Sequence, residues 1–414
     1  MAKCAFCGNE INFGDRSISH CKGGCNRTLF LCKCGAANKP LASYCRHCGE
    51  KISFSDAERR FNRNLKITAA VPDQPMHELS LSRFAISQAA DLSQLYFSYG
   101  YMLLLLRNGR IFIMGCGNGN VEEVFDLPGE LNLSPVEFTA NSTRAILIFT
   151  AGGIYKLDMI RDFHRERIFS TESDDIKIDR QPICIDDQLF LTLRDERQSD
   201  AQLRLVSLDR GNVPLLSLKG RVSQPVRSGS KIFFYTQEEV FVYDHAKRDF
   251  SYRDENRYGF DVGIEPKSDG SRVYVLGDEN RIYRISLDAR EPEIFGLPHP
   301  QVIQANFDVM NGQILISHTG GVLVTNVLGQ VEWSSEQVFS VYPAYKFSPI
   351  SFGNYLAFVM THPQTEVLYI VERPKYKQIV SFLGSFIIKP VFYAGYLYVG
   401  VEEDEGLKIK VYSL

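Results

Sequence analysis

Residues 100–115 read GYMLLLLRNGRIFIMG and contain the pattern that decides the fold. An apolar run from Met102 to Leu106 is followed by Asn108-Gly109 and by a second run from Ile111 to Met114. Asn-Gly between two apolar runs is a strong hairpin signal, because both central residues of the tight turn need a left-handed backbone. Gly100 marks a further turn before the first run. The stretch therefore predicts a turn followed by two antiparallel strands.

The same order of turn residue and apolar run recurs through the rest of the chain. Successive turn residues are 41 to 45 residues apart, which is too regular to arise by chance over more than three hundred residues. They are Gly100, Ser142, Asp187, Gly229, Gly270, Gly312, Gly353 and Gly395. A short run before each marker and a weaker one after the hairpin, such as Val121 to Phe125, bring the prediction to four strands per unit.

Four short strands at a period of about 40–45 residues are typical of a β-propeller blade. A blade cannot bury both of its faces alone, so the units must stack around an axis. We expect residues 67–414 to form a β-propeller of eight blades, or of seven if one weak unit is misread. A helical solenoid fits poorly because apolar residues rarely recur at helical spacing. A pair of β-sandwiches would not explain the constant period.

The last unit contains three predicted strands, which leaves its outer edge unpaired. An unpaired strand edge favours aggregation, and circular folds usually close it with a strand from elsewhere in the chain. Residues 65–85 include the apolar stretches Leu65 to Ala70 and Leu79 to Leu81. We expect this segment to complete the final blade.

Eight of the ten cysteines lie within the first fifty residues, in four closely spaced pairs. The pairs are Cys4 and Cys7, Cys21 and Cys25, Cys32 and Cys34, and Cys45 and Cys48. Two thiolates a few residues apart can reach one zinc ion at about 2.3 Å, and two such pairs complete a tetrahedron. The simplest assignment is sequential, with Cys4, Cys7, Cys21 and Cys25 binding one ion and the other four binding a second. Four sulfur ligands leave no open position for water, so both sites are expected to be structural.

A disulfide framework is the alternative for these cysteines. It would require an oxidising compartment, and no hydrophobic leader is visible at the start of the sequence, so we expect a cytoplasmic protein. Cysteines one to two residues apart also seldom bridge each other. His20 and His47 flank ligand cysteines and could replace one, although solvent-facing positions are the expectation for both.

Two stretches resemble known families. Leu31 to Glu50, LCKCGAANKPLASYCRHCGE, resembles the second half of a double zinc ribbon, with Asn38 at its usual place and a departure at the short Cys32-x-Cys34 spacing. The resemblance covers residues 1–50 and implies a small docking module. The repeats loosely resemble quinoprotein-type repeats, as in Ser286-Leu287-Asp288 and Gly329 to Trp333. This second resemblance implies a fold and carries no activity.

Residues 51–66 form a basic linker between the two regions. Ser55 to Glu58 is a capping-box pattern, which predicts a short helix starting near Asp56. We interpret it as a solvated connector, with a phosphate-binding arm as the alternative. Residues 1–66 carry a formal charge of +7, which two zinc ions bound by four thiolates each would reduce to about +3. The basic signal for nucleic acid is therefore weak.

No catalytic constellation is recognisable. The histidines are scattered, and Cys116 and Cys184 lie in apolar stretches typical of core thiols. The most apolar stretch, Ser381 to Val401, contains Lys389 and Pro390 and predicts two strands around a turn, so no membrane insertion is expected.

We therefore expect a non-catalytic adaptor or scaffold that binds two structural zinc ions and docks partner proteins, with no small-molecule substrate evident. The alternative is nucleic-acid binding through the ribbons and linker. Its phosphate contacts would come from basic residues of that region, namely Lys22, Arg27, Lys33, Arg46, Arg59, Arg60 and Arg63.

Overall fold

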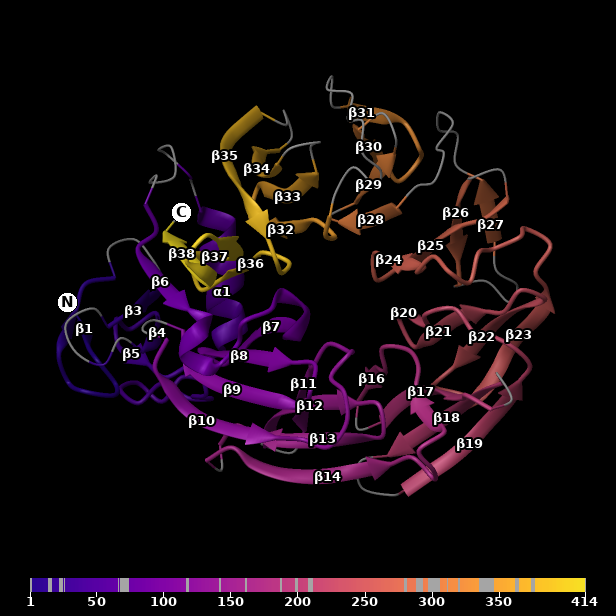
Figure 1. Ribbon diagram of the computed structural model, residues 1–414, viewed down its shortest axis with the longest axis horizontal. Coiled ribbons are helices and arrows are strands. Elements are labelled where there is room, and N and C mark those ends of the chain that lie inside the picture. Colours follow the sequence, from indigo (N-terminus) through magenta and orange to yellow (C-terminus); the bar gives the residue numbers. More distant parts are fainter. Residues whose placement is uncertain are drawn as a thin grey trace.

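The computed structural model of the chain describes residues 2–413 except 14–16, 22–24, 26, 66, 68–73, 117–118, 141–142, 161, 187, 198–199, 208–210, 279–280, 288–292, 297–305, 311, 319–320, 335–345, 362–364 and 374–376. The described part is mainly β, with one α-helix (Figure 1). Two of the turn residues that mark the repeat, Ser142 and Asp187, lie outside it.

The N-terminal region contains two small sheets. Their strands are β1 (Ala2–Lys3) and β2 (Glu10–Ile11), then β3 (Ile18–His20), β4 (Thr28–Leu31) and β5 (Ala37–Asn38).

The remaining strands form a series of antiparallel sheets in sequence order. The first sheet comprises β7 (Leu92–Ser98), β8 (Tyr101–Leu106), β9 (Arg110–Gly115) and β10 (Val121–Asp126). The second comprises β11 (Val136–Ala140), β12 (Thr143–Thr150), β13 (Gly153–Asp158) and β14 (His164–Ser170). The third comprises β15 (Ile176–Ile178), β16 (Ile183–Ile185), β17 (Gln188–Asp195), β18 (Ala201–Ser207) and β19 (Gly211–Leu218). The fourth sheet comprises β20 (Val226–Ser228), β21 (Lys231–Tyr235), β22 (Glu239–Asp244) and β23 (Asp249–Glu255). The fifth comprises β24 (Lys267–Ser268), β25 (Arg272–Leu276), β26 (Ile282–Ser286) and β27 (Glu293–Gly296). The sixth comprises β28 (Asn306–Met310), β29 (Gln313–His318), β30 (Gly321–Asn326) and β31 (Val331–Ser334). The last, larger sheet comprises β32 (Ile350–Phe352), β33 (Tyr355–Thr361), β34 (Glu366–Glu372), β35 (Lys377–Phe386), β36 (Val391–Tyr393), β37 (Tyr396–Glu403), β38 (Gly406–Ser413) and β6 (His77–Ser80).

These sheets follow one another around a common centre, which gives a β-propeller-like arrangement (Figure 1). Strands such as β20, β24, β28 and β36 lie nearest the centre, and β20, β24 and β36 are each paired with the next strand across a short turn. Six of the turns hold a glycine with positive φ: Gly100, Gly229, Gly270, Gly312, Gly353 and Gly395. Only glycine adopts this conformation without strain, which explains why the turn residue is so visible in the sequence.

The core consists of apolar layers between neighbouring sheets. On β8, Leu103 and Leu105 pack with Ile146 and Ile148 of the next sheet. The alternate residues of β8, Leu104 among them, pack on the other side with the last sheet. Both faces of the strand are therefore buried, and its sequence is a continuous apolar run where a half-exposed strand would alternate with polar residues.

Strand β6 supplies an outer strand to the last sheet. It is antiparallel to β38, with Leu79 opposite Ile409 and Glu78 opposite Lys410. Leu79 is buried, and it belongs to the apolar cluster that joins the first and last sheets. The segment from which we expected a closing strand thus pairs with the free edge of β38. The 3₁₀ turn η1 (Leu81–Phe84) lies at the end of that segment, and a second one, η2 (Ala89–Asp91), follows it.

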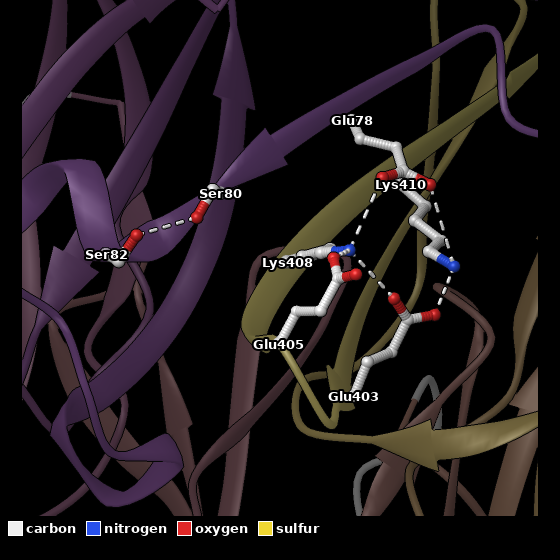
Figure 2. A network of polar contacts seen from close by, with 7 residues as sticks. All are labelled: Glu78, Ser80, Ser82, Glu403, Glu405, Lys408 and Lys410. Carbon is white, nitrogen blue, oxygen red and sulfur yellow. Dashed lines mark hydrogen bonds and ion pairs between the residues drawn. The ribbon is translucent and has the colours of Figure 1, made fainter.

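Five charged side chains cover the junction of β6, β37 and β38 (Figure 2). Lys408 contacts Glu78 at 3.7 Å, Glu403 at 3.1 Å and Glu405 at 2.8 Å. Lys410 pairs with Glu78 and Glu403. The hydrogen bond from Lys410 lowers the pKa of Glu403, and hydrogen bonds to Glu405 and Glu403 raise the pKa of Lys408. The network therefore favours the charged forms on both sides.

This network predicts a pH dependence that a single variant can isolate. Because the folded pKa of Glu403 is lowered, its contribution to stability is complete above the unfolded pKa of about 4.3 and is lost as the pH falls through the folded value. Glu403→Gln should lower stability at pH 7 by at most about 1 kcal/mol, since the pair is partly exposed. Thermal unfolding of both proteins from pH 8 to pH 3 should show a constant difference that closes only on the acid side. A difference that does not begin to narrow below about pH 4, under the unfolded pKa of Glu403, would contradict this assignment.

Helix α1 (Phe54–Asn64) begins earlier than predicted. Its N-cap is Ser53, whose hydroxyl accepts a hydrogen bond from the Asp56 backbone N–H at 3.4 Å. The interpretation as a solvated connector is wrong, because Phe54, Ala57 and Phe61 are buried against the last sheet. Their spacing of three and four residues places them on one helical face, and this periodicity is readable in the sequence. Arg59 and Arg60 lie on the exposed side.

No helix among the described residues is long and apolar enough to cross a membrane. The apolar stretch Ser381 to Val401 ends β35, forms β36 and enters β37, so it contributes to three strands where two strands around a turn were predicted.

Candidate metal centres

The first group of cysteines, Cys4, Cys7, Cys21 and Cys25, converges on one point. All four sulfurs lie within 4.8 Å of one another. The Sγ atoms of Cys4 and Cys25 are 3.6 Å apart, as are those of Cys7 and Cys21. A tetrahedron of sulfurs at about 2.3 Å from a zinc ion has edges of about 3.8 Å, whereas a disulfide needs about 2.05 Å. The group could therefore hold a metal ion, and its size is consistent with zinc.

The second group, Cys32, Cys34, Cys45 and Cys48, has the same size. Its sulfurs also lie within 4.8 Å of one another. The Sγ atoms of Cys32 and Cys48 are 3.7 Å apart, and those of Cys34 and Cys45 are 3.6 Å apart. The single residue between Cys32 and Cys34 does not keep their sulfurs from joining the group. The sequential assignment of the eight cysteines thus corresponds to the two groups in space.

Tight turns aim the sulfurs inward. The Cys4 and Cys45 carbonyls accept hydrogen bonds from the Gly8 and Gly49 backbone N–H groups at 3.1 and 3.0 Å. Both glycines have positive φ, which lets the chain reverse within the knuckle. Backbone N–H groups then point at sulfur, as from Phe6 to Cys4 at 3.3 Å. Such donors stabilise the thiolate form that a metal requires.

Asn38 supports the second group from its buried position on β5. Its amide nitrogen donates to the Ala36 carbonyl at 2.8 Å and lies 3.7 Å from Cys45 Sγ. Its amide oxygen accepts from the Arg46 backbone N–H at 3.1 Å. The side chain therefore fixes the knuckle and a ligand together, which gives a physical reason for asparagine at this place in the ribbon pattern.

The thiols of each group differ in proton affinity. Hydrogen bonds from the Asn9 and Cys25 backbones lower the pKa of Cys7 to about 6. Burial raises the pKa of Cys25 and of Cys32 to about 12. Four neighbouring thiolates repel one another, so full ionisation of either group needs a cation at its centre.

The two flanking histidines have different surroundings. His47 is exposed, as expected, and its backbone N–H donates to Cys45 Sγ at 3.4 Å. The expectation that His20 faces solvent is wrong, because it is only 6% exposed. Its Nδ1 is 3.0 Å from the Thr28 hydroxyl, and its ring stacks on Tyr396 at 4.5 Å. His20 thus joins β3 to β37.

The N-terminal region with the two cysteine groups and α1 pack on the first and last of the larger sheets through a docking face formed by His20, Arg27, Phe30, Pro40 and Phe54. Phe54 contacts both Phe30 and Tyr393, with ring centroids 5.8 and 6.0 Å apart. Arg27 pairs with Glu122 on β10 at 3.1 Å. A Cβ atom on Gly100 would lie 2.8 Å from the Pro40 ring, so the close approach needs glycine there. Sequence patterns did not reveal this interface, since its residues come from segments far apart in the chain.

The remaining candidate residues have structural surroundings. Cys116 is buried in the layer between the first and last sheets, and burial raises its pKa. Cys184 is half-buried on β16, and Trp333 packs beside the cluster that joins β29, β30 and β33. Asp186 and the stretch Glu402 to Glu405 lie at strand ends and turns.

Comparison with known proteins supports the fold and nothing beyond it. BamB from Moraxella catarrhalis, a β-propeller of quinoprotein-like repeats, matches with a TM-score of 0.54 and 11% identity over 82% of this chain and 99% of BamB. The computationally designed Ika8 protein matches with a TM-score of 0.58 and 11% identity over 79% of this chain and 98% of its own. No protein-family model matches the sequence, and no curated protein matches it. The chain therefore has a β-propeller-like fold joined to two cysteine groups able to hold metal ions.

Proposed function

We propose that this chain is a non-catalytic adaptor of the cytoplasm, in which an eight-bladed β-propeller and a double zinc ribbon together dock partner proteins. The observation that carries the proposal is the fixed position of the ribbons on the propeller. They contact the first and last sheets through the docking face, so both modules present their outer surfaces as one body. A rigid scaffold with variable loops is well suited to recognition.

Zinc is the metal that we assign to both groups. Eight thiols in two tetrahedral groups suit zinc, and four sulfurs in each group fill the tetrahedral positions, which leaves none for a reacting water. Reduced thiols are also typical of the cytoplasm, which supports that compartment. The count of eight blades rests on the sequence period and on counting the last, larger sheet as two blades, divided between β35 and β36.

A crevice between ribbon and propeller is the best candidate contact region. It has a volume of about 200 Å³, and its lining includes Phe6 and Lys39 from the ribbons with Tyr99, Tyr101 and Ile160 from the propeller. Ile160 is 52% exposed, and Tyr44 of the second ribbon is 63% exposed. Exposed aromatic and apolar side chains beside charged ones are typical of protein interfaces.

Photo-crosslinking tests the adaptor proposal. A crosslinking amino acid is placed at Tyr44, at Ile160 and, as a control, at Val213 on the outer strand β19, which is 56% exposed. Irradiation in the source cells should give one protein adduct shared by the first two positions and missing from the third. Equal adducts at all three positions, or turnover of a substrate by the purified chain, would contradict the proposal.

The nucleic-acid alternative draws less support, because several of its basic side chains already have partners within the chain. Arg27 is paired with Glu122, Arg59 with Asp56, and Arg46 donates to the Lys3 carbonyl at 2.9 Å. Lys22 lies outside the described residues, and the side chain of Arg63 is likewise not described. If the alternative holds, binding of duplex DNA should weaken with salt at a slope of about −0.9 per phosphate contact. An affinity that does not change with salt would exclude nucleic-acid binding through these phosphate contacts.

A further inference from the structure

The two cysteine groups use the same kind of knuckle. In the first group, the Cys4 backbone N–H donates to the Asn9 carbonyl at 2.8 Å. In the second, the Cys45 backbone N–H donates to the Glu50 carbonyl, also at 2.8 Å. Each acceptor directly follows the knuckle glycine in the sequence. Asn9 and Glu50 therefore occupy equivalent backbone positions beside their groups.

The side chains at these two positions differ in chemistry. Glu50 presents a carboxylate, and its Oε2 atom lies 3.8 Å from the Cys32 sulfur. Asn9 presents a neutral amide. Among the described residues, no carboxylate is hydrogen-bonded to a sulfur of the first group. The second centre thus has an anionic oxygen donor at its edge that the first centre lacks.

Glu50 lies just outside the second group. Within the part of the chain that the structure describes, the ligand atoms that lie within 4.8 Å of one another there are the four sulfurs. Cys32 is buried, whereas the Glu50 side chain is 46% exposed. An exposed side chain changes rotamer rapidly, while the bond from Cys45 holds the backbone of Glu50 in place. The carboxylate can therefore move to the position of the Cys32 sulfur without a change in the surrounding packing.

The charges around Glu50 fit a role as a metal ligand. Four thiolates around one divalent ion leave a net charge of −2, and the Glu50 carboxylate adds to it. Lys33 offsets the extra charge, since its Nζ atom lies 3.6 Å from Glu50 Oε1. The two carboxylate oxygens thus face different partners, one a cation and the other a metal-binding sulfur. Zinc accepts carboxylate oxygens at about 2.0–2.2 Å as well as sulfur.

We propose that Glu50 is a reserve ligand of the second metal centre, which binds the metal in place of Cys32 when that sulfur is not bound. In this exchange the metal–sulfur bond to Cys32 breaks, a metal–oxygen bond to Glu50 forms, and the freed thiolate takes a proton from water. The metal keeps four ligands, and a carboxylate carries the same charge as the thiolate that it replaces. The second centre therefore tolerates the loss of one cysteine, and the first does not. The inference rests on the proposed assignment of zinc.

Zinc affinities of four full-length proteins test the reserve ligand. They are the wild type, Cys32→Ala, Glu50→Gln and the variant with both changes, each titrated in competition with a chromophoric chelator. Cys32→Ala should still bind two ions, and the added Glu50→Gln should weaken the second site at least roughly tenfold. Glu50→Gln should have little effect while Cys32 is present. A residue that only positions the ligands would act equally in both backgrounds, so this coupling identifies a ligand.

Cys21→Ala is the matched control in the first group. Its sulfur lies 3.6 Å from that of Cys7, as the Cys32 sulfur lies 3.7 Å from that of Cys48, but its knuckle carries Asn9. Cys21→Ala should therefore weaken its site at least roughly tenfold more than Cys32→Ala weakens the second one. Cys32→Ser keeps the shape of the side chain and should repeat the result of Cys32→Ala.

Three outcomes would contradict these assignments. Loss of the second ion from both Cys32 variants would overturn the reserve ligand, and so would an effect of Glu50→Gln that is the same with and without Cys32. Equal losses in Cys21→Ala and Cys32→Ala would do so as well. A wild-type chain that binds no zinc would instead overturn the metal assignment on which the inference rests.

Discussion

Loss of one metal centre should unfold the part of the N-terminal region that it holds and release the docking face from the larger sheets. Structural zinc sites supply apparent folding free energies of about 10–16 kcal/mol in small zinc-finger peptides, and the N-terminal sheets here have only two or three short strands. Cys4→Ser and Cys45→Ser each remove a buried ligand of one group. We expect two metal ions per wild-type chain and one in each variant, measured by atomic emission after dialysis.

The structural consequence should reach the propeller. Gly100 donates its backbone N–H to the Tyr393 hydroxyl at 2.8 Å, beside the contact with Pro40. Amide exchange near Gly100 and proteolysis before residue 54 should both accelerate in the two variants or after chelation. Cys184→Ser is the control, because Cys184 belongs to neither group. Metal-free wild-type protein with an intact, protected ribbon would refute the assignment.

Shortening Leu79 should be the most damaging single change in the closing strand. Leu79 is 1% exposed and packs in the cluster between the first and last sheets. Leu79→Ala should lower the free energy of unfolding by about 2–5 kcal/mol, because it removes buried methyl groups and leaves a cavity. Denaturant titration measures this loss, and the exposed edge of β38 should also favour aggregation.

The neighbouring residue provides the matched comparison for Leu79. Glu78→Gln removes two of the ion pairs in Figure 2, yet it should cost at most about 1 kcal/mol, since Glu78 is 41% exposed. A larger loss for Glu78→Gln than for Leu79→Ala would mean that charge, and not apolar contact, seals the last sheet.

Much of the metal chemistry could be predicted from short-range spacing. The spacing of paired cysteines such as Cys45 and Cys48 predicts a pair of metal ligands from only a few residues, because a knuckle is a local turn. The location of His20 could not be predicted this way. Its partner Tyr396 is hundreds of residues away in the sequence, so no local pattern connects the two.

Helix α1 shows an intermediate case. The helix and its amphipathic spacing can be predicted from the local sequence, whereas the surface on which it packs cannot. Gly395 lies so close to Phe61 that a Cβ atom would be 2.8 Å from the ring. The capping signal at Ser55 was misassigned because serine also stands at position 53, and only the backbone geometry distinguishes the two.

The sequence by itself determined the strand period, the turns and the ligand groups, because each depends on residues within about one unit of the chain. Positive φ at Gly100 and at the corresponding turn glycines is a local requirement of the backbone, and it can be recognised in the sequence because glycine meets it. Only the tertiary structure decided where the ribbons dock and which side chains meet at the centre. Contacts such as Arg27 with Glu122 and Lys267 with Asp308 depend on how the sheets stack, and stacking brings together residues that no sequence spacing relates.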